Sequence, residues 1–293
     1  MRVFLTGATG FIGSAILDNL IGAGHQVVGL ARSDEAVARL VKAGAEARRG
    51  ELTDLDGLAA GARASDGVIH TAFIHDFSVY AANVETDRRA VDALAGALEG
   101  SGKPLVIASG TMMVSHARPA TEHDAPASPD VPRAASEERV LRAHGVRGSV
   151  VRLAPSVHDR SRAGLVSAIA EIAREKRVAA YVGDGANRWP AVHRLDAARL
   201  FCLALERAAA GSRLHAAAEE GIPMRIIAEA IGERLGVPVR SMSLEEATAL
   251  FGPFAFFSTI DNPTSSAITR NTIGWQPREE GLLADMPQSE YLS

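Results

Sequence analysis

Three glycines near the amino terminus have the spacing of a phosphate-binding turn. Gly7, Gly10 and Gly13 follow the apolar residues 3–5, which predict a short buried strand, and residues 11–20 have the apolar spacing of a helix. Backbone N–H groups at the start of such a helix, with the positive end of its dipole, attract a phosphate. Gly7 permits the tight turn, Gly10 lets a pyrophosphate approach, and Gly13 lets the helix lie close to the sheet. The alternative is a turn that serves packing alone.

The second predicted strand covers residues 26–31, and its end lies where the ribose of a bound dinucleotide would be expected. An acidic residue at this place in a βαβ unit binds the free 2′-hydroxyl of NAD. Arg32 and Ser33 follow the strand here, and a guanidinium with a hydroxyl suits a 2′-phosphate through charge-assisted hydrogen bonds. We therefore expect NADP, with NAD as the less favoured cofactor. In the alternative, Arg32 is only solvated and Asp34 caps the next helix, residues 34–43.

The run Thr6-Gly7-Ala8-Thr9-Gly10-Phe11-Ile12-Gly13 resembles the opening of a known superfamily. Its G-x-x-G-x-x-G spacing, placed directly after a strand, is similar to that of the short-chain dehydrogenases/reductases, in particular the extended and atypical, epimerase/dehydratase-like members. The resemblance implies an α/β fold, a doubly wound parallel sheet (Rossmann) with a smaller carboxy-terminal substrate lobe. We expect the dinucleotide-binding core at 1–153 and most of the substrate lobe at 154–293, with core elements returning at about 187–217. Cofactor contacts are expected from Gly7, Thr9, Gly10, Phe11, Ile12 and Gly13.

The same resemblance implies cofactor contacts at the ends of later strands. Glu51 departs from a Gly-Asp-Leu that lies beside the adenine in the family, and Asp54 is expected to cap the helix 55–63. Asn83 matches an asparagine on the helix 77–98, the alternative being an ordinary exposed amide. Pro155 matches a proline that forms a rigid wall over the nicotinamide. The expected contacts are Arg32, Ser33, Glu51, Leu52, Thr71, Ala72, Phe73, Ser109, Pro155 and Ser156.

The catalytic hydroxyl of the superfamily falls at the end of the predicted central strand, residues 104–108. The family's serine aligns near Gly110, so Ser109 and Thr111 compete for hydrogen-bonding the reacting carbonyl, and each could instead cap a loop. Thr111 and Ser109 are accordingly the catalytic candidates. His70, at another strand end, is expected to be a satisfied structural histidine.

The acid of the superfamily is a tyrosine four residues before a lysine on the following helix, and this chain lacks both. Matching Ser136 to the family's serine puts Arg133 at the tyrosine place and Glu137 at the lysine place. No tyrosine or lysine occurs from 105 to 175. General acid catalysis contributes about 10²–10⁴-fold, so a slower enzyme without the pair is feasible.

Two functions remain compatible with that absence. In the first, an NADP-dependent oxidoreductase transfers hydride to or from a small carbonyl compound, with water, His116 or His158 supplying the proton. In the second, the fold is a non-catalytic NADP(H)-binding, redox-sensing regulator. Sugar-nucleotide epimerase or dehydratase chemistry depends on the tyrosine and is the least favoured.

The second half continues the resemblance with a G-D-G…R…V-x-x-D pattern. It implies that Arg188 reaches the substrate and that Asp196 caps the following helix. Met112 is expected to contact substrate. Residues 278–293 are polar and are expected to be loosely held. Phe251, Phe254, Phe256 and Phe257 either line an apolar pocket together with Met112 and Met113 or form core or a subunit contact.

Composition excludes several other classes of protein. The chain has 293 residues, 47% hydrophobic and 23% charged, and its formal charge of −4 gives no basic footprint for nucleic acid. The single cysteine, Cys202, excludes an internal disulfide and suits a reducing cytoplasm. A strand beginning at residue 2 or 3 leaves no room for a signal peptide, and no apolar run predicts a membrane span. The pair His70 and His75 does not have the spacing of a standard metal site.

The resemblance also implies a homodimer, formed through the helices near 77–98 and 133–144.

Overall fold

A seven-stranded parallel sheet forms the larger part of the molecule, as expected for the doubly wound fold. The computed structural model describes residues 1–76, 79–114, 118–126, 128, 131, 133–161, 163–252 and 254–292, without the side chains of Phe254 and Phe256. The strand order is β10-β6-β5-β4-β1-β2-β3, and every pair is parallel. The strands are β1 (Arg2–Thr6), β2 (Gln26–Ala31), β3 (Glu46–Arg49), β4 (Gly67–His70), β5 (Pro104–Gly110), β6 (Arg147–Leu153) and β10 (Ser212–Ala216).

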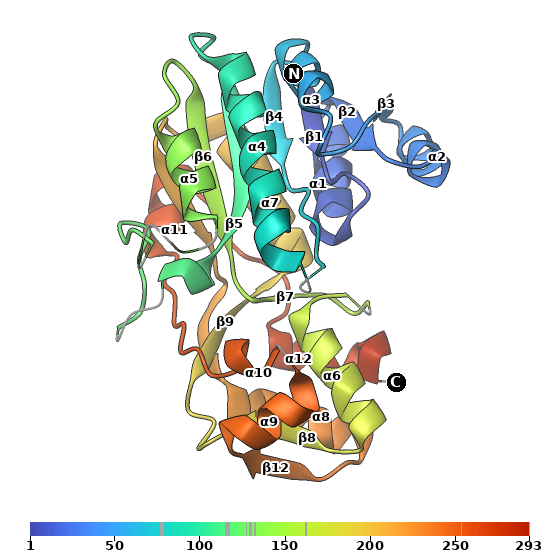
Figure 1. Ribbon diagram of the computed structural model, residues 1–293, viewed down its shortest axis with the longest axis vertical. Coiled ribbons are helices and arrows are strands. Elements are labelled where there is room, and N and C mark those ends of the chain that lie inside the picture. Colours follow the sequence, from blue (N-terminus) through green and yellow to red (C-terminus); the bar gives the residue numbers. More distant parts are fainter. Residues whose placement is uncertain are drawn as a thin grey trace.

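Helices cover both faces of this sheet (Figure 1). One layer packs with one hydrophobic cluster and the other layer with a second cluster. The first layer contains α1 (Phe11–Gly22), α2 (Asp34–Lys42), α7 (Arg194–Arg207) and α11 (Ala267–Ile273). The second contains α3 (Leu55–Arg63), α4 (Tyr80–Leu98) and α5 (Ala134–Leu141). The predicted cap is confirmed at α3, where the Asp54 carboxylate accepts the N–H of Gly57 at 2.9 Å.

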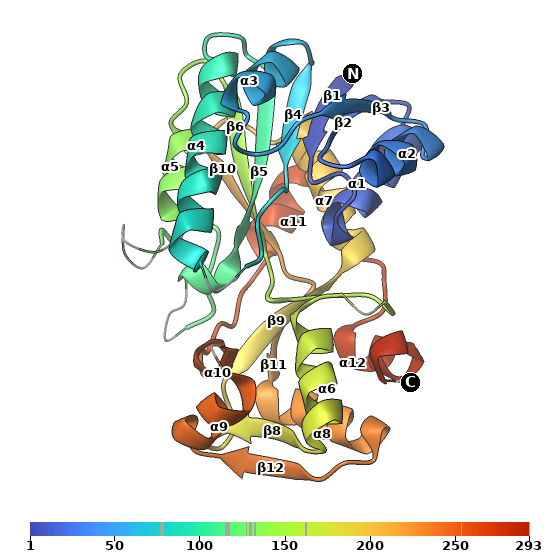
Figure 2. The ribbon, with the colours of Figure 1, turned by 45° about the vertical axis from the view of Figure 1, so that its right-hand side comes forward.

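A smaller lobe lies at the carboxyl ends of the strands (Figure 2). Its own core includes Trp189, Ile227 and Leu282, all fully buried. The chain enters it from β6, and Thr111, just beyond β5, is hydrogen-bonded to its Asn262. Its elements are β7 (Ser156–His158), α6 (Leu165–Lys176), β8 (Ala179–Val182), β9 (Arg188–His193), β11 (Glu219–Pro223), α8 (Met224–Leu235), β12 (Val239–Met242), α9 (Leu244–Phe251), α10 (Phe254–Phe257) and α12 (Leu282–Asp285).

The carboxy-terminal segment corrects one prediction. Residues 278–292 are not loosely held, because Leu282, Met286, Tyr291 and Leu292 are each at most 3% exposed. These apolar side chains are few in a polar stretch, but they all join the core of the small lobe. Ser293 lies outside the described residues.

Two predicted helix starts cannot be compared residue by residue. Phe77, at the predicted start of α4, and Pro132, before α5, lie outside the described residues, and the described helices begin at Tyr80 and Ala134. None of the helices that the structure describes is long and apolar enough to cross a membrane.

Candidate active site

The glycine-rich turn forms a cradle in which Gly7 and Gly13 leave no room for a side chain. Gly7 has φ +72°, and a Cβ on Gly13 would lie 1.9 Å from the carbonyl oxygen of Gly7. A Cβ on Gly10 would meet only that same oxygen, at 3.1 Å, so the outer side of the turn is open. Gly10 is also the N-cap of α1 and supplies no capping side chain, which leaves the first N–H groups of the helix for a ligand. The residues present therefore fit the pyrophosphate of a dinucleotide.

The segment that follows β4 lies directly against this cradle. Thr71 donates its hydroxyl to the carbonyl of Thr6 at 2.9 Å, and a Cβ on Gly7 would come within 2.7 Å of the Ala72 nitrogen. Thr71, Ala72 and Phe73 are half-buried, as residues that line a ligand would be. Asn83 is buried and donates from Nδ2 to the carbonyl of Asp76 at 2.8 Å, so it holds this segment in place. The exposed-amide alternative for Asn83 is wrong.

Two arginines lie at the ends of the neighbouring strands β2 and β3. Arg32 is exposed and, within the described ranges, makes no hydrogen bond or ion pair. Arg49 ends β3 in register with Ala31, one residue before Arg32, and pairs with Asp34 at 2.9 Å. Sequence analysis missed Arg49, although a parallel register between consecutive predicted strands would have found it. The side chain that caps α2 is Ser33, not Asp34, since its Oγ accepts the N–H of Ala36.

The adenine-side residues have different surroundings. Glu51 is exposed and accepts the hydroxyl of Thr53 at 2.7 Å. The Leu52 side chain is only 8% exposed and packs into the core beneath α3 and α4, so any contact from this residue would come from its backbone. Their cofactor roles stay predictions.

The two hydroxyls after the central strand are both buried and both engaged. Ser109 Oγ lies 3.8 Å from the sulfur of Met113. Thr111 Oγ1 donates to Oδ1 of Asn262 at 2.6 Å, and Nδ2 of Asn262 donates back to the Thr111 carbonyl at 2.9 Å. This reciprocal pair connects the end of β5 to the small lobe. The contact of the Ser109 hydroxyl with a thioether sulfur is a weaker hydrogen bond than that of Thr111 with the Asn262 amide.

Two of the expected cofactor contacts, Pro155 and Ser156, lie where the chain leaves β6 for the small lobe. Pro155 is half-buried between β6 and β7, and Ser156 is fully buried with no hydrogen-bond partner for its Oγ among the described residues. Met112 packs against the core of the small lobe.

The lysine place of the superfamily is occupied by a buried ion pair. Glu137 and Arg152 are both fully buried, with Nε–Oε1 at 2.9 Å and Nη2–Oε2 at 2.7 Å. Arg152 also donates to the carbonyl of Asp124 at 2.8 Å. Because both oxygens of Glu137 are engaged by Arg152, this residue joins α5 to β6 and does not reach a ligand.

The tyrosine place is occupied by Arg133, which lies at the carboxyl edge of the sheet. Its Nη2 donates to the carbonyl of Ala108 at 2.6 Å and lies 3.3 Å from Oδ1 of Asp87. Its guanidinium lies 4.8 Å above the ring of Phe73. The cation therefore stands between a predicted cofactor-lining residue and the strand that carries Ser109. Sequence analysis noted Arg133 only as a departure from the family's pattern.

A buried carboxylate anchors this arginine. Asp87 accepts the hydroxyl of Ser136 at 2.9 Å and lies 3.3 Å from Nε2 of His70, whose Nδ1 is 2.8 Å from Thr6 Oγ1. Burial alone would raise the pKa of Asp87, but Arg133 and the hydrogen bonds of His70 and Ser136 lower it to about 2. His70 is thus fully engaged in structure, in agreement with its expected role.

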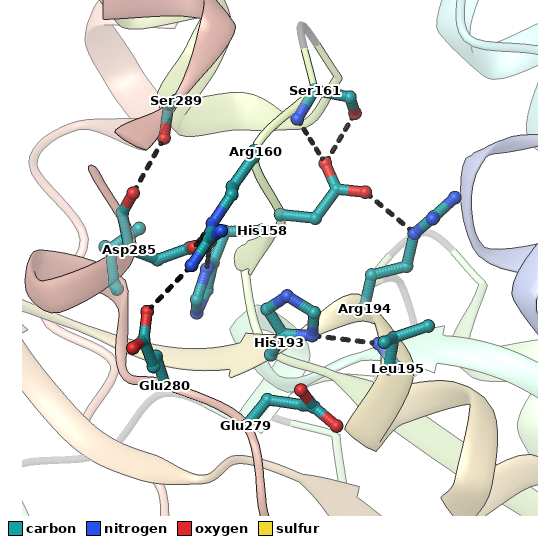
Figure 3. Close-up of polar contacts among 12 residues, drawn as sticks. His158, Arg160, Ser161, His193, Arg194, Leu195, Glu279, Glu280, Asp285 and Ser289 are labelled. Atoms are coloured by element: carbon teal, nitrogen blue, oxygen red, sulfur yellow. Dashed lines mark hydrogen bonds and ion pairs between the residues drawn. The ribbon is translucent and has the colours of Figure 1, made fainter. Parts of the chain in front are cut away.

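Of the two histidines expected as proton sources, the structure describes only His158. His116 lies outside the described residues. His158 is buried, with Nδ1 3.1 Å from Oδ2 of Asp285 and its ring edge-on to His193 at 5.3 Å. Figure 3 shows Arg160 joining the same carboxylate, at 2.9 Å, so this cluster fastens the carboxy-terminal segment to β7. Burial lowers the pKa of His158.

The two residues singled out in the G-D-G…R…V-x-x-D pattern, Arg188 and Asp196, both bind other parts of the protein. Arg188 makes two hydrogen bonds to Asp261, from Nε at 3.0 Å and from Nη2 at 2.7 Å, and stays half-exposed. The predicted cap at Asp196 is wrong, since α7 begins at Arg194 and His193 Nδ1 accepts the N–H of Leu195. Asp196 lies inside the first turn, and its carboxylate accepts the N–H groups of Arg278 and Glu279.

The phenylalanine cluster lies mainly in the core. Phe251 is 7% exposed within the small-lobe core, and Phe257 packs against it. The side chains of Phe254 and Phe256 lie outside the described part of the chain. Among the residues that the structure describes, no group of three His, Cys, Asp or Glu side chains could hold a metal ion.

Comparison with known proteins decides the family. Residues 3–217 match the model of the NAD dependent epimerase/dehydratase family. The chain belongs to this family. The predicted relationship to the extended short-chain dehydrogenases/reductases is therefore confirmed, although the usual tyrosine and lysine are absent.

Relatives in sequence include both fungal and bacterial proteins. An uncharacterized protein of Schizosaccharomyces pombe is 47% identical over 99% of this chain and 100% of its own length. An uncharacterized protein of Saccharomyces cerevisiae is 45% identical over 98% of each chain. A 2-alkyl-3-oxoalkanoate reductase of Stenotrophomonas maltophilia is 26% identical over 85% of this chain and 80% of that protein.

Solved structures show the same fold at low identity. Pal from Bacillus thuringiensis is similar with a TM-score of 0.80 at 20% identity, covering 100% of this chain and 98% of its own. The dTDP-glucose 4,6-dehydratase DesIV of Streptomyces venezuelae, solved with NAD bound, gives 0.77 at 20% identity over the whole of both chains. These likenesses establish the fold and not the substrate.

Proposed function

We propose that this protein is an NADP-dependent oxidoreductase that transfers hydride to or from the carbonyl carbon of a small ketone. The open glycine cradle at the start of α1 carries the proposal, because it fits a dinucleotide pyrophosphate at the edge where such sheets bind ligands. The reductase among the relatives favours a ketone substrate. The bound cofactor would supply the hydride, while Phe73 and Pro155 would flank the nicotinamide and Arg188 or Met112 would meet the substrate.

A second candidate function is a regulator that binds NADP(H) without turnover. It is favoured by the α5 region, where the places of the catalytic pair are taken by Arg133, bound to Asp87, and by Glu137, bound to Arg152. The two functions share the cofactor site and differ in chemistry.

Turnover with a simple ketone separates these functions. We expect the purified protein to oxidise NADPH when ethyl acetoacetate or a related small ketone is added, measured as loss of NADPH absorbance. Binding of NADPH without turnover on any of a panel of ketones would instead support the regulator.

The preference for NADP is proposed to depend on Arg32 with Arg49 beside it. Charge-assisted hydrogen bonds contribute about 1.5–3 kcal/mol, so Arg32→Ala should raise the Kd for NADPH about 10–100-fold. The Kd for NADH should stay unchanged, because that cofactor lacks the 2′-phosphate. Arg234→Ala, at an exposed arginine of α8, is the matched control. Equal losses for both dinucleotides in Arg32→Ala would refute this role.

We also propose that the protein forms a homodimer through α4 and α5. Its proposed location is the cytoplasm. The outer faces of these helices carry ion pairs, including Arg88–Asp92 at 2.9 Å and Arg139–Asp92 at 3.1 Å, so such an interface would be polar. Burial raises the pKa of the Cys202 thiol to about 12, consistent with an inert cysteine in a reducing compartment.

A further inference from the structure

Arg133 has more hydrogen-bonding capacity than the protein around it uses. Of its three guanidinium nitrogens, Nη2 serves both Ala108 and Asp87. Within the part of the chain that the structure describes, Nε and Nη1 have no hydrogen-bond acceptor, although Nε is buried. A buried donor without a partner costs about 1–3 kcal/mol. The guanidinium is therefore held in place with donors to spare, at the carboxyl edge of the central strand.

The backbone of Arg133 is unusual as well. This residue has φ 68°, one of two non-glycine residues with positive φ among those described. Such a conformation costs about 1–3 kcal/mol and is found preferentially at functional sites. The strain lets Arg133 precede α5 while its side chain turns back over Phe73.

Tyr80, in the first turn of α4, approaches the same aromatic ring as this cation. Its ring is edge-on to that of Phe73, with the centroids 6.1 Å apart, while the Arg133 guanidinium covers the same Phe73 ring at 4.8 Å. His75 also stands edge-on to Phe73, at 5.3 Å. Phe73 thus gathers a phenol, an imidazole and a guanidinium at the segment expected to line the cofactor.

We propose that Tyr80 and Arg133 replace the tyrosine and lysine that this chain lacks, with Tyr80 as the proton donor and Arg133 as the cation that stabilises the oxyanion. The carbonyl carbon accepts the hydride that NADPH supplies, the C=O π bond breaks onto oxygen, and that oxygen takes the proton of Tyr80 Oη. The phenolate that remains is stabilised by Arg133 and is reprotonated by water.

The electrostatic surroundings suit these roles. Burial raises the pKa of Tyr80, Arg133 lowers it and Asp87 raises it, so the phenol stays protonated at neutral pH and can act as an acid. Burial and Arg133 together lower the pKa of His75, which leaves that imidazole neutral and a poorer acid than a phenol next to a guanidinium. Among the described residues, His70 and Asp87 are further titratable groups near Arg133, and they contact each other at 3.3 Å.

One test follows the ionisation of tyrosine and needs no substrate. The protein has three tyrosines, Tyr80, Tyr181 and Tyr291, and Tyr80→Phe identifies the Tyr80 step in a phenolate absorbance titration. Arg133→Met should raise the pKa of Tyr80, whereas Arg133→Lys, which keeps the cation, should restore it towards the wild-type value. If Arg133→Met fails to fold, Arg133→Gln also removes the charge but keeps an amide that can donate to the carbonyl of Ala108. If the pKa of Tyr80 stays the same in these variants, the proposed pairing of Tyr80 with Arg133 is wrong.

A second test measures turnover and rests on the proposed function. With NADPH and ethyl acetoacetate, Tyr80→Phe should lower kcat about 10²–10⁴-fold while the Kd for NADPH stays unchanged. Tyr181→Phe, on β8 of the small lobe, is the matched control and should behave as wild type. Full turnover in Tyr80→Phe overturns this inference and leaves the proposed function intact. Absence of NADPH binding in the wild type refutes the proposed function, and binding without turnover contradicts both.

Discussion

Glu137→Gln is expected to lower the free energy of unfolding by about 3–5 kcal/mol, since it leaves the fully buried Arg152 without its counter-charge. Both side chains have no exposed surface, and among the described residues the other partners of the guanidinium are the Asp124 carbonyl and the nearby His215, both on Nη1. Thermal or denaturant unfolding followed by circular dichroism measures the loss. Most of it should appear as a lower midpoint with an unchanged denaturant slope.

Two companion variants define the cause of that loss. Glu138→Gln removes the neighbouring, partly exposed carboxylate, which pairs with Arg142 and Arg213, and should cost at most about 1 kcal/mol. Replacing both partners, as Glu137→Leu with Arg152→Met, should recover much of the stability, because no charge is then left buried and unpaired. A single Glu137→Gln variant as stable as wild type would contradict the structural role assigned to this residue.

Gly13→Ala is expected to abolish dinucleotide binding, with the Kd for NADPH raised by about 100-fold or more. The new Cβ would lie 1.9 Å from the Gly7 carbonyl oxygen and 2.7 Å from its carbonyl carbon. Both are backbone atoms, so the turn and the helix must move apart. The N–H groups of the cradle then lose their common direction. NADPH fluorescence titration measures the effect.

Gly22→Ala is the matched control, in the same helix. A Cβ there meets nothing within 4 Å and its backbone needs no positive φ. Alanine is the better helix former by about 0.5–1 kcal/mol, so this variant should bind NADPH as wild type does and be no less stable. If Gly13→Ala also bound NADPH normally, the cradle would have a purely packing role.

Local patterns in the sequence were sufficient for most of the fold. The strand β2 and the helix α3 have the boundaries that periodicity and capping residues predicted. In these elements apolar spacing and the polar residues at the ends agree, so that few alternatives compete. The glycine cradle was predictable for the same reason, because the contact between Gly7 and Gly13 that shapes it is local.

The features that the sequence did not predict depend on contacts between residues that are far apart in the chain. Asp196 has the residue type of a helix cap, but the N–H groups that it binds belong to Arg278 and Glu279, some eighty positions away. The pairing of Thr111 with Asn262 spans a still longer gap, of 151 residues. Arg133 and Tyr80 reach the same Phe73 ring because α4 and α5 pack against each other at the sheet edge. No local pattern marks such pairs.

Binding of NADPH and NADH to the wild-type protein, followed by nicotinamide fluorescence, tests the central claim most directly. The cradle at α1 and the guanidinium of Arg32 predict that NADPH binds and that it binds more tightly than NADH. Failure of both dinucleotides to bind at millimolar concentration would contradict the account.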